Sequence, residues 1–447
     1  MSLRELLSKM EQLGLVKTIA TPVAPYLEAA RLIHRLEGQP VLLRAPRDSS
    51  YPIVAGICAS RELMALGLGV PKERLLFRLA EALQNPVSPP MVSDAPCQQV
   101  IEPSVNLSSL PVLTHLPGDG GPYVTAGVAV IKDPDYGRNT AFHRLMLLDE
   151  HRFAVRIVEG RGTETAFRKA GGDLEMAVAI GNDLPVLLAA AMSPPKGVDE
   201  LAIAHALGPT PLVKCRTVDL EVPAEAEIIL EGKLKHELVP EGPFLDLTET
   251  IDLVRQQPIF EVQCITHRQD AMYQALLPGG QEHKLLMGVP REPTIYAEVN
   301  EVCPCVNVLI TPGGASWLHA VVQIRKENPD DGGKAIRAAF RGHSSLKHVV
   351  IVDEDINIYD PHEVEWAIAT RFQADHDLVI LMDQPSSSLD PSALHLPGRK
   401  ARTSKMGLDA TIPWWSPGGG LRSEQEREEF YKLRYEDIDL SRFVQEP

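Results

Sequence analysis

The chain has 447 residues, which is too many for one ordinary hydrophobic core, so we expect two or three domains. Its 44% hydrophobic and 23% charged residues are typical of a globular protein, and its net charge of -16 argues against general nucleic-acid binding, which needs a basic surface. The net charge does not exclude an anionic small-molecule ligand, because the local field decides whether such a ligand binds.

The sequence contains no apolar run of transmembrane length. Its first residues predict an amphipathic helix with a Ser2/Glu5 capping box rather than a signal peptide. The cysteines are scattered apart from Cys303 and Cys305, and one pair at that spacing, without a partner pair, argues against a zinc ribbon. We therefore expect reduced cysteines and a cytoplasmic protein without a membrane partner.

The N-terminal part of the chain alternates helix and strand patterns. Helices are predicted over residues 3–13, 26–36 and from Pro71 to about 84, and a strand over residues 40–44. A proline-rich connector over residues 86–96 indicates the first boundary. We therefore predict an N-terminal α/β domain over residues 1–95.

Strand patterns dominate the middle of the chain and give way to mixed patterns near residue 297. The predicted central strands are 124–131, 140–148, 152–158, 176–180, 226–230 and 260–266, with helices near 163–169 and 200–207. We predict a barrel-like β domain over residues 96–296. Alternating strand and helix patterns follow at 306–310, 318–324, 334–341, 349–353, 362–372 and 378–382, which predict an α/β domain over residues 297–447 with a loop-like tail after Gln384.

A predicted hairpin, formed by strands 140–148 and 152–158 around a polar turn at 149–151, stands out for its cations. On or beside it lie Arg138, Asn139, His143, Arg144, Arg152, Arg156 and Arg161. Strands seldom carry so many cations unless they face an anion or solvent. A phosphate-bearing cofactor would account for several of them, and a solvated antiparallel face is the alternative.

Residues 240–246 form a Pro- and Gly-rich turn that presents two carboxylates, Glu241 and Asp246. Two carboxylates beside an arginine can divide acid and base duties, because the cation and burial push their pKa values apart. The alternative is an ordinary acidic turn at the surface.

Two further stretches carry charged residues that could bind a metal ion or a phosphate. Asp199 and Glu200 open a predicted helix, where acidic residues are favoured in any case, and a hard-metal site would need more oxygen ligands from elsewhere. Lys405 lies among small residues in the predicted loop 404–411, where its amine could hold a phosphate as a point charge. A solvated loop is the alternative for that stretch.

Taken together, these stretches resemble the UbiD family of decarboxylases, which use prenylated flavin mononucleotide (prFMN). The resemblance spans nearly the whole chain and is carried by residues 95–99, 138–144, 193–200, 222–232, 240–246 and 404–411, the last two being the most specific. It implies an α+β protein with an N-terminal α/β domain, a central flavin-binding split β-barrel and a C-terminal α/β domain used in oligomerisation.

The resemblance also implies roles for single residues. Asn139 and Glu200 match metal ligands, for manganese with a nearby potassium ion. Arg144 matches the arginine that faces the reacting carboxylate and the flavin, Glu241 its partner in a charge network, and Asp246 an acidic proton donor. The positions that match cofactor contacts are Phe142, His143, Arg144, Arg156, Ile157, Val158, Arg161 and Gly162, with Lys405 at the cofactor phosphate.

The sequence departs from the family pattern at one metal ligand. Many members have a histidine after the second hairpin strand, whereas residues 159–162 contain none; Glu159 is a candidate substitute. A regular strand would also place Asn139 and Arg144 on opposite faces, because their spacing is odd. We therefore predict a bend near Asn139 if both side chains reach one site.

The implied reaction is a reversible, non-oxidative decarboxylation. Loss of carbon dioxide from an unsaturated carbon leaves a carbanion, and the protein itself has no electron sink, whereas a modified flavin can accept those electrons. Arg144 would orient the carboxylate, and Asp246 or Glu241 would deliver the proton that replaces it. A flavin prenyltransferase would supply the cofactor, and the family pattern implies a homo-oligomer, either a dimer or a hexamer.

A Gly-rich loop over residues 277–291 bears on the substrate, because His283 and Arg291 could hold a second anionic group. This pair is similar to that of the furan-2,5-dicarboxylate decarboxylase branch, so the predicted reaction is furan-2,5-dicarboxylate to 2-furoate. The alternatives are a hydroxybenzoate, a pyrrole carboxylate or a phosphorylated unsaturated acid as substrate, a purely structural loop, or a non-catalytic assembly subunit.

Overall fold

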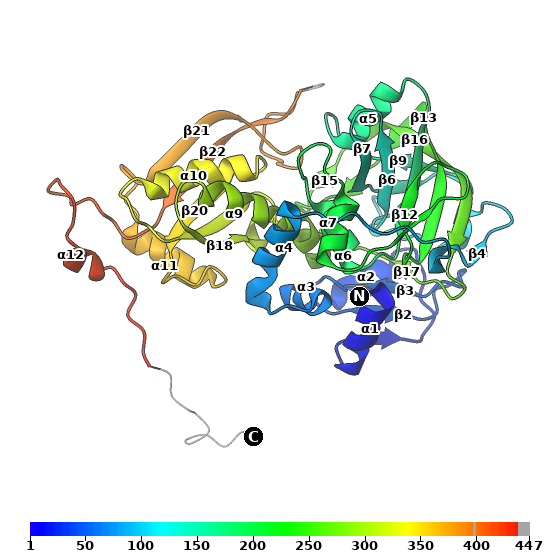
Figure 1. Cartoon of the computed structure of the whole chain (residues 1–447), viewed down its shortest axis with the longest axis horizontal. Helices are drawn as coiled ribbons and strands as arrows, with labels where there is room; N and C mark the ends of the chain where they lie inside the picture. Colours follow the sequence, from blue (N-terminus) through cyan, green and yellow to red (C-terminus); the bar gives the residue numbers. More distant parts are fainter. Residues whose placement is uncertain (397–398, 437–447) are drawn as a thin grey trace, which may run out of the picture. The chain divides into compact units, whose positions relative to one another are not determined.

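The computed structural model describes residues 1–396 and 399–436. The chain forms two compact units (Figure 1). The first comprises residues 1–294 together with the segments Ile310–His319 and Pro385–Arg402. The second contains Ile295–Leu309, Ala320–Gln384 and the described residues from Thr403 onward. No helix in the described residues is long and apolar enough to cross a membrane.

A small sheet with helices opens the first unit, as predicted. Its strands are β1 (Lys17–Ile19), β2 (Val41–Leu43), β3 (Ile53–Ala55) and β17 (Tyr273–Gln274), in that spatial order. Its helices are α1 (Leu3–Gln12), α2 (Glu28–Arg35), α3 (Arg61–Leu68) and α4 (Leu75–Gln84). The capping box of Ser2 and Glu5 is present at the start of α1, which confirms that prediction.

A nine-stranded sheet forms the centre of the first unit. Its strands are β4 (Val100–Ile101), β5 (Tyr123–Val124), β6 (Val128–Asp133), β7 (Gly137–Phe142), β8 (Leu145–Leu147), β9 (Arg152–Val155), β10 (Leu174–Ile180), β13 (Ile228–Glu241) and β16 (Arg255–His267). The order is β5-β8-β9-β16-β13-β10-β6-β7, with β4 beside β16. Strands β5 and β7 end this order, and within the described residues they do not pair with each other, so the predicted barrel-like β domain is β-rich, as expected, but its sheet is open.

Two helices with small surrounding elements cover this sheet. All eight residues of α6 (Leu184–Ala191) are buried, and α7 (Glu200–Leu207) packs against it in the same apolar cluster. The other elements are α5 (Gly162–Ala170), β11 (Leu212–Lys214), β12 (Glu221–Pro223), β14 (Phe244–Leu245), β15 (Ile251–Asp252), α8 (Gln281–Gly288) and η4 (Val289–Arg291), and α9 (Glu292–Asn300) begins in this unit and belongs mostly to the second. Helix α6 was not predicted, because an apolar run lacks the periodicity of a half-exposed helix.

The cation-rich hairpin differs from the prediction at one point. The single strand predicted over residues 140–148 is two strands, β7 and β8, and the break falls at His143 and Arg144 rather than near Asn139. Strand β7 pairs with β6, whereas β8 pairs with β5 and β9. The predicted bend is therefore present but misplaced, and it lets Arg144 leave the plane of either strand.

The second unit is built on a five-stranded sheet with helices. The strands β18 (Cys305–Ile310), β19 (His319–Ile324), β20 (His348–Asp353), β21 (Leu378–Pro385) and β22 (Arg402–Asp409) follow the order β18-β19-β20-β22-β21, and the helices are α10 (Asp331–Gly342), α11 (Pro361–Arg371) and α12 (Glu424–Glu428). The prediction of a loop around Lys405 is wrong. Strand β22 runs parallel to β20, and this pairing stabilises a stretch whose small and polar residues do not indicate a strand.

Candidate active site

Arg144 is the centre of a buried charge cluster. Its Nε and Nη2 donate to the two carboxylate oxygens of Glu241 at 2.9 and 3.0 Å. Its Nη1 donates to Asp246 at 2.7 Å, and its Nη2 also donates to Asp252 at 2.8 Å. The side chain of Arg144 is only 9% exposed. The structure thus brings together Arg144, Glu241 and Asp246, and adds Asp252, which was not predicted.

One chain segment supplies all three carboxylates. Strand β13 ends at Glu241 directly opposite Arg255, the first residue of β16. Between them β14 and β15 pair antiparallel, with Phe244 opposite Asp252. The segment therefore folds back on itself, and its Phe244 ring lies 4.6 Å from the guanidinium carbon of Arg144. Strand register, rather than loop flexibility, fixes these carboxylates around the arginine.

Burial and neighbouring charges have opposite effects on the pKa of Arg144. Burial alone would lower the pKa of Arg144, but the hydrogen bonds and charge of Glu241, with the charges of Asp246 and Asp252, raise that pKa overall. Tyr123 is fully buried and donates its hydroxyl to Glu241 at 3.1 Å. Burial and the Glu241 carboxylate together raise the pKa of Tyr123, which keeps it a neutral donor.

Asn139 and Glu200 meet at a second point, as the family resemblance implied. The Asn139 amide donates to Glu200 at 3.2 Å, and the Thr140 backbone N–H donates to its other oxygen at 2.9 Å. Glu200 is buried, and burial raises the pKa of its carboxyl to about 7. A Cβ added to Gly162 would lie 2.8 Å from the Asn139 side-chain oxygen, so a glycine is needed there for this arrangement.

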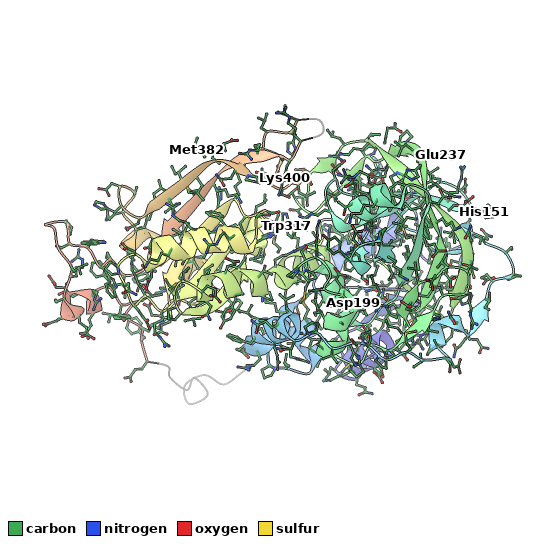
Figure 2. The ribbon with its side chains drawn as sticks, turned by 45° about the horizontal axis from the view of Figure 1, so that its top comes forward. His151, Asp199, Glu237, Trp317, Met382 and Lys400 are labelled. Carbon is green, nitrogen blue, oxygen red and sulfur yellow. The ribbon has the colours of Figure 1, made fainter. Side chains whose placement is uncertain are left out.

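A salt bridge explains how Glu200 reaches this position. Arg138 on β7 donates to Asp199 and to Glu221 at 2.7 and 2.8 Å. Asp199, labelled in Figure 2, also accepts the Leu201 N–H and so caps the N-terminus of α7. Because Asp199 is fixed by both contacts, Glu200 begins the helix facing β7.

Asn139 and Glu200 alone do not complete the metal site that the family resemblance implies. Among residues 1–396 and 399–436, no group of three or more His, Cys, Asp or Glu side chains is arranged to hold a metal ion. Glu159, the candidate substitute for the absent histidine, is 72% exposed and lies 3.6 Å from Arg156 in an ion pair. Asn139 and Glu200 thus supply two side-chain ligands at most, and further ligands must come from a bound group.

Apart from Lys405, the predicted cofactor contacts follow the break between β7 and β8 or flank β9. His143 contacts the Arg156 carbonyl through Nδ1 at 2.9 Å and Thr163 through Nε2 at 2.8 Å, and burial lowers its pKa. Burial also lowers the pKa of Arg156. Ile157 is buried, and Phe142 and Val158 are partly buried. Lys405 lies on β22 in the second unit, where its amine donates to the Ser344 carbonyl at 2.7 Å.

His283 occupies the start of α8. Its Nδ1 accepts the Gly279 N–H at 3.1 Å, so the ring proton lies on Nε2, which can donate. Burial lowers the pKa of His283, and the charges of Asp246 and Arg144 act on it as well. His283 therefore lies near the Arg144 cluster as a neutral N–H donor.

Arg291 lies at the end of η4 in an unusual environment. Its Nε is buried without a hydrogen-bond partner, and its side chain has no carboxylate partner within the described part of the chain. Its guanidinium carbon lies 5.5 Å from the ring centre of Trp317 (Figure 2), and the Trp317 indole N–H donates to Ser387 at 3.0 Å. Burial and the charge of Arg161 lower the pKa of Arg291 to about 9. An arginine with a buried Nε normally has an acidic partner, but Arg291 has no counter-ion among the described residues.

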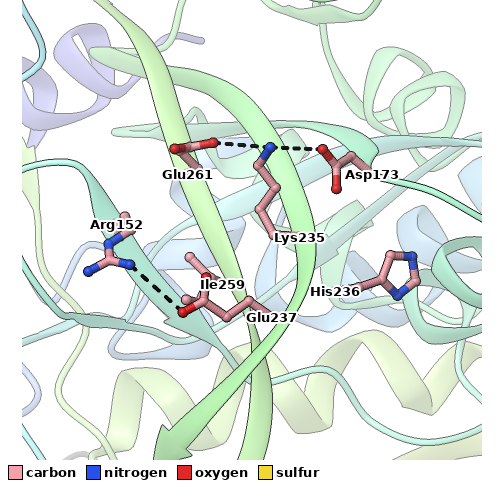
Figure 3. A pocket seen from close by; sticks show the side chains of 7 residues that line it. All are labelled: Arg152, Asp173, Lys235, His236, Glu237, Ile259 and Glu261. Carbon is pink, nitrogen blue, oxygen red and sulfur yellow. Dashed lines mark hydrogen bonds and ion pairs between the residues drawn. The ribbon is translucent and has the colours of Figure 1, made fainter.

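A separate hollow of about 470 Å³ lies on the nine-stranded sheet and contains none of the predicted site residues (Figure 3). Lys235 pairs with Asp173 and Glu261 at 2.8 and 3.2 Å, and Arg152 lies 4.0 Å from Glu237. Its charges are mutually compensated, which distinguishes it from the surroundings of Arg291.

Comparison with known proteins assigns the whole chain to one family pattern. Three models of 3-octaprenyl-4-hydroxybenzoate carboxy-lyase match consecutive stretches: the N-terminal domain over residues 7–83, the Rift-related domain over 90–281 and the C-terminal domain over 284–410. Anhydromevalonate phosphate decarboxylase of Methanothermobacter thermautotrophicus is 44% identical over 92% of this chain and 97% of its own length.

Solved structures of the enzyme class agree. The UbiD-class enzyme HmfF from Pelotomaculum thermopropionicum, solved with FMN, is 40% identical with a TM-score of 0.91, covering 99% of this chain and 100% of that one. An evolved dimeric form of HmfF, solved with prFMN, is 38% identical with a TM-score of 0.87 and the same coverage.

Proposed function

Because this chain belongs to the UbiD family of carboxy-lyases, we propose that it decarboxylates a phosphorylated α,β-unsaturated acid with the help of prFMN. The relative named anhydromevalonate phosphate decarboxylase supports this substrate class. A dehydrated mevalonate phosphate carries a carboxylate next to a double bond at one end and a phosphate monoester at the other. Such a substrate needs one cation for each end.

The environment of Arg291 is the observation that carries the proposal. Arg291 and Arg161 lie close enough for one charge to lower the pKa of the other, and neither side chain has an acidic partner in the described residues. Two like charges held together without a counter-ion favour binding of an anion. A phosphate monoester carries nearly two negative charges at neutral pH, so it matches this pair better than a second carboxylate does. Arg161, which the family resemblance assigns to the cofactor, thereby gains a role toward the substrate.

The Arg144 cluster would act at the other end of the substrate. Arg144 offers its Nη1 to the carboxylate that leaves, and Asp246, which shares that nitrogen, is the nearest acid that could protonate the product carbon. Glu241 keeps the guanidinium oriented through both of its oxygens. The complete set of Arg144, Glu241 and Asp246 argues against the non-catalytic assembly subunit.

The residues present fit a phosphate-bearing cofactor with a divalent cation. Glu200 is a buried carboxylate without a cationic side chain beside it in the described residues, and Asn139 adjoins it. A manganese ion would supply the missing positive charge, and the cofactor phosphate the missing oxygen ligands. Bound prFMN would provide the electron sink that decarboxylation requires. HmfF, solved with FMN and with prFMN, supports this choice of cofactor.

A second candidate substrate is furan-2,5-dicarboxylate. The likeness to HmfF and the pairing of His283 with Arg291 support it, because a neutral N–H donor and a cation can together hold a carboxylate. This candidate would use Arg291 without Arg161. The homo-oligomer expected for this chain agrees with the dimeric form of evolved HmfF and can be measured by light scattering.

A substrate panel tests the proposal. Protein co-expressed with a flavin prenyltransferase would be incubated with dehydrated mevalonate phosphate, its dephosphorylated acid and furan-2,5-dicarboxylate. We expect the phosphorylated acid to have the highest kcat/KM and its dephosphorylated form to lose roughly a hundredfold, as when two charged hydrogen bonds are lost. Equal rates with and without the phosphate, or preference for the diacid, would overturn the assignment.

A further inference from the structure

The hydrogen bonds of Arg144 leave little room for a substrate. A guanidinium has five N–H groups. The Nε–H and one Nη2–H go to Glu241, the other Nη2–H goes to Asp252, and one Nη1–H goes to Asp246. One N–H, on Nη1, has no protein acceptor in the described residues. A substrate carboxylate can therefore reach Arg144 only at Nη1, where Asp246 is already bound.

The carboxylates around Arg144 differ in the number of contacts that hold them and in their exposure. Both oxygens of Glu241 contact Arg144, and the residue is fully buried. Asp246 uses one oxygen on Arg144, while the other accepts the N–H of the next residue at 2.6 Å, and its side chain is 17% exposed. Glu241 holds the arginine through two contacts and is fully buried, whereas Asp246 holds it through one and is partly exposed, so Asp246 is the one that can leave more readily.

Asp252 resembles Glu241 in this respect. One of its oxygens accepts from Arg144, and the other accepts from Arg255 and from the Leu253 N–H. Its backbone is paired in β15 opposite Phe244, and Arg255 is fixed by its register opposite Glu241. Both arginines lower the pKa of Asp252 against the effect of its burial, so it is held as an anion. Asp252 therefore has two cationic partners, each fixed by strand pairing.

We propose that Asp252 is a positioning residue of the reaction: held by Arg255, it occupies the Nη2 side of Arg144, so that the substrate carboxylate must bind at the remaining N–H on Nη1, where its negative charge repels Asp246 from the same nitrogen and displaces it. The proposal rests on the proposed function of Arg144. Displaced from the cation, the Asp246 carboxylate takes up a proton from solvent and can give it to the product carbon. Asp252 thereby couples carboxylate binding to the release of the acid.

The Asp252→Asn variant tests this coupling in the prFMN-loaded protein. The amide keeps the size of the side chain, removes its charge and frees the Nη2 side of Arg144. We expect the saturated counterpart of the phosphorylated acid, which cannot react, to bind about threefold to tenfold tighter, because a neighbouring negative charge is gone. We expect kcat to fall by about tenfold to a hundredfold, because the carboxylate no longer has to displace Asp246. A residue that merely supports the fold would weaken binding instead.

Two further variants complete the experiment. Arg255→Met removes one partner of Asp252 and should change binding and kcat in the same directions by less. Asp149→Asn removes a partly exposed aspartate that pairs with Arg152, and should change neither. Binding that is unchanged or weaker in Asp252→Asn, or an unchanged kcat, would overturn the proposal. If the parental protein converts no acid of the panel, the proposed function fails, and binding of the saturated acid alone then decides the role of Asp252.

Discussion

Replacing Arg291 by methionine should weaken activity toward the phosphorylated acid without lowering the stability of the fold. The side chain of Arg291 is partly buried beside Trp317, with its Nε fully buried, and has no acidic partner in the described residues, so no protein group loses a hydrogen bond when it is removed. The lost cation–π contact is worth about 0.5–2 kcal/mol, whereas burying an uncompensated cation costs several kcal/mol. The free energy of unfolding should therefore stay the same or rise.

The same variant should lose its anionic substrate. Each charged hydrogen bond to a phosphate contributes about 1.5–3 kcal/mol, so losing one or two should raise KM by roughly tenfold to ten-thousandfold. The dephosphorylated acid should be affected far less, because it makes no contact there. Steady-state kinetics on both acids, with thermal unfolding followed by circular dichroism, would measure the two effects together.

Arg61→Met is the matched control. Arg61 forms an ion pair with Glu292, whose side chain is fully buried. Removing this arginine leaves a buried carboxyl without its partner and should destabilise the protein by about 3–5 kcal/mol. The reasoning is refuted if Arg291→Met unfolds as readily as Arg61→Met, or if it treats the phosphorylated and dephosphorylated acids alike.

Three further outcomes are expected. Glu241→Gln and Asp246→Asn should each reduce decarboxylation by about 10²–10⁴-fold while still binding prFMN, measured by absorbance of the purified protein; parental rates would remove both from the mechanism. Gly162→Ala should weaken manganese binding by about tenfold in a spin-resonance titration, because a Cβ there would lie 2.8 Å from the Asn139 side-chain oxygen and displace it from Glu200. Because the ionised form of Glu200 would bind manganese and burial raises the pKa of its carboxyl to about 7, manganese affinity should rise as pH rises through that value, and a flat profile would contradict this.

Much of the fold could be predicted because helix signals are local. The capping box of Ser2 and Glu5 and the acidic start of α7 at Glu200 both depend on residues a few positions apart. The strands were less predictable. Strand β22 depends on pairing with β20, and the break at His143 and Arg144 depends on β7 and β8 having different partners. The partner of β22 is distant in the sequence, whereas β6 and β9 directly adjoin β7 and β8, so what could not be read there was which neighbour each strand pairs with.

In the candidate site, too, residues within a local motif could be predicted, whereas those placed by strand pairing or by their neighbours in space could not. Arg144, Glu241 and Asp246 were predicted together from two motifs, and the structure joins them. Asp252 was missed because it lies between Ile251 and Leu253 in a stretch without a motif, and only the β14–β15 pairing brings it to Arg144. The lack of a counter-ion at Arg291 could not be predicted either, because it depends on which acidic residues are absent from its neighbourhood in space.

The discontinuity of the first unit has a consequence for biosynthesis. Trp317, which lies beside Arg291, and Ser387, which accepts its indole N–H, belong to segments separated by residues of the second unit. Domains tend to fold in the order in which the ribosome releases them, but this unit cannot form the hydrogen bond from Trp317 to Ser387 until Ser387 has been translated. While most of the second unit is synthesised, the nascent protein therefore contains Arg291 and Trp317 but not yet the serine to which Trp317 donates. A messenger truncated before codon 385 would yield a polypeptide whose Arg144 cluster is encoded in full, but whose tryptophan lacks its serine anchor.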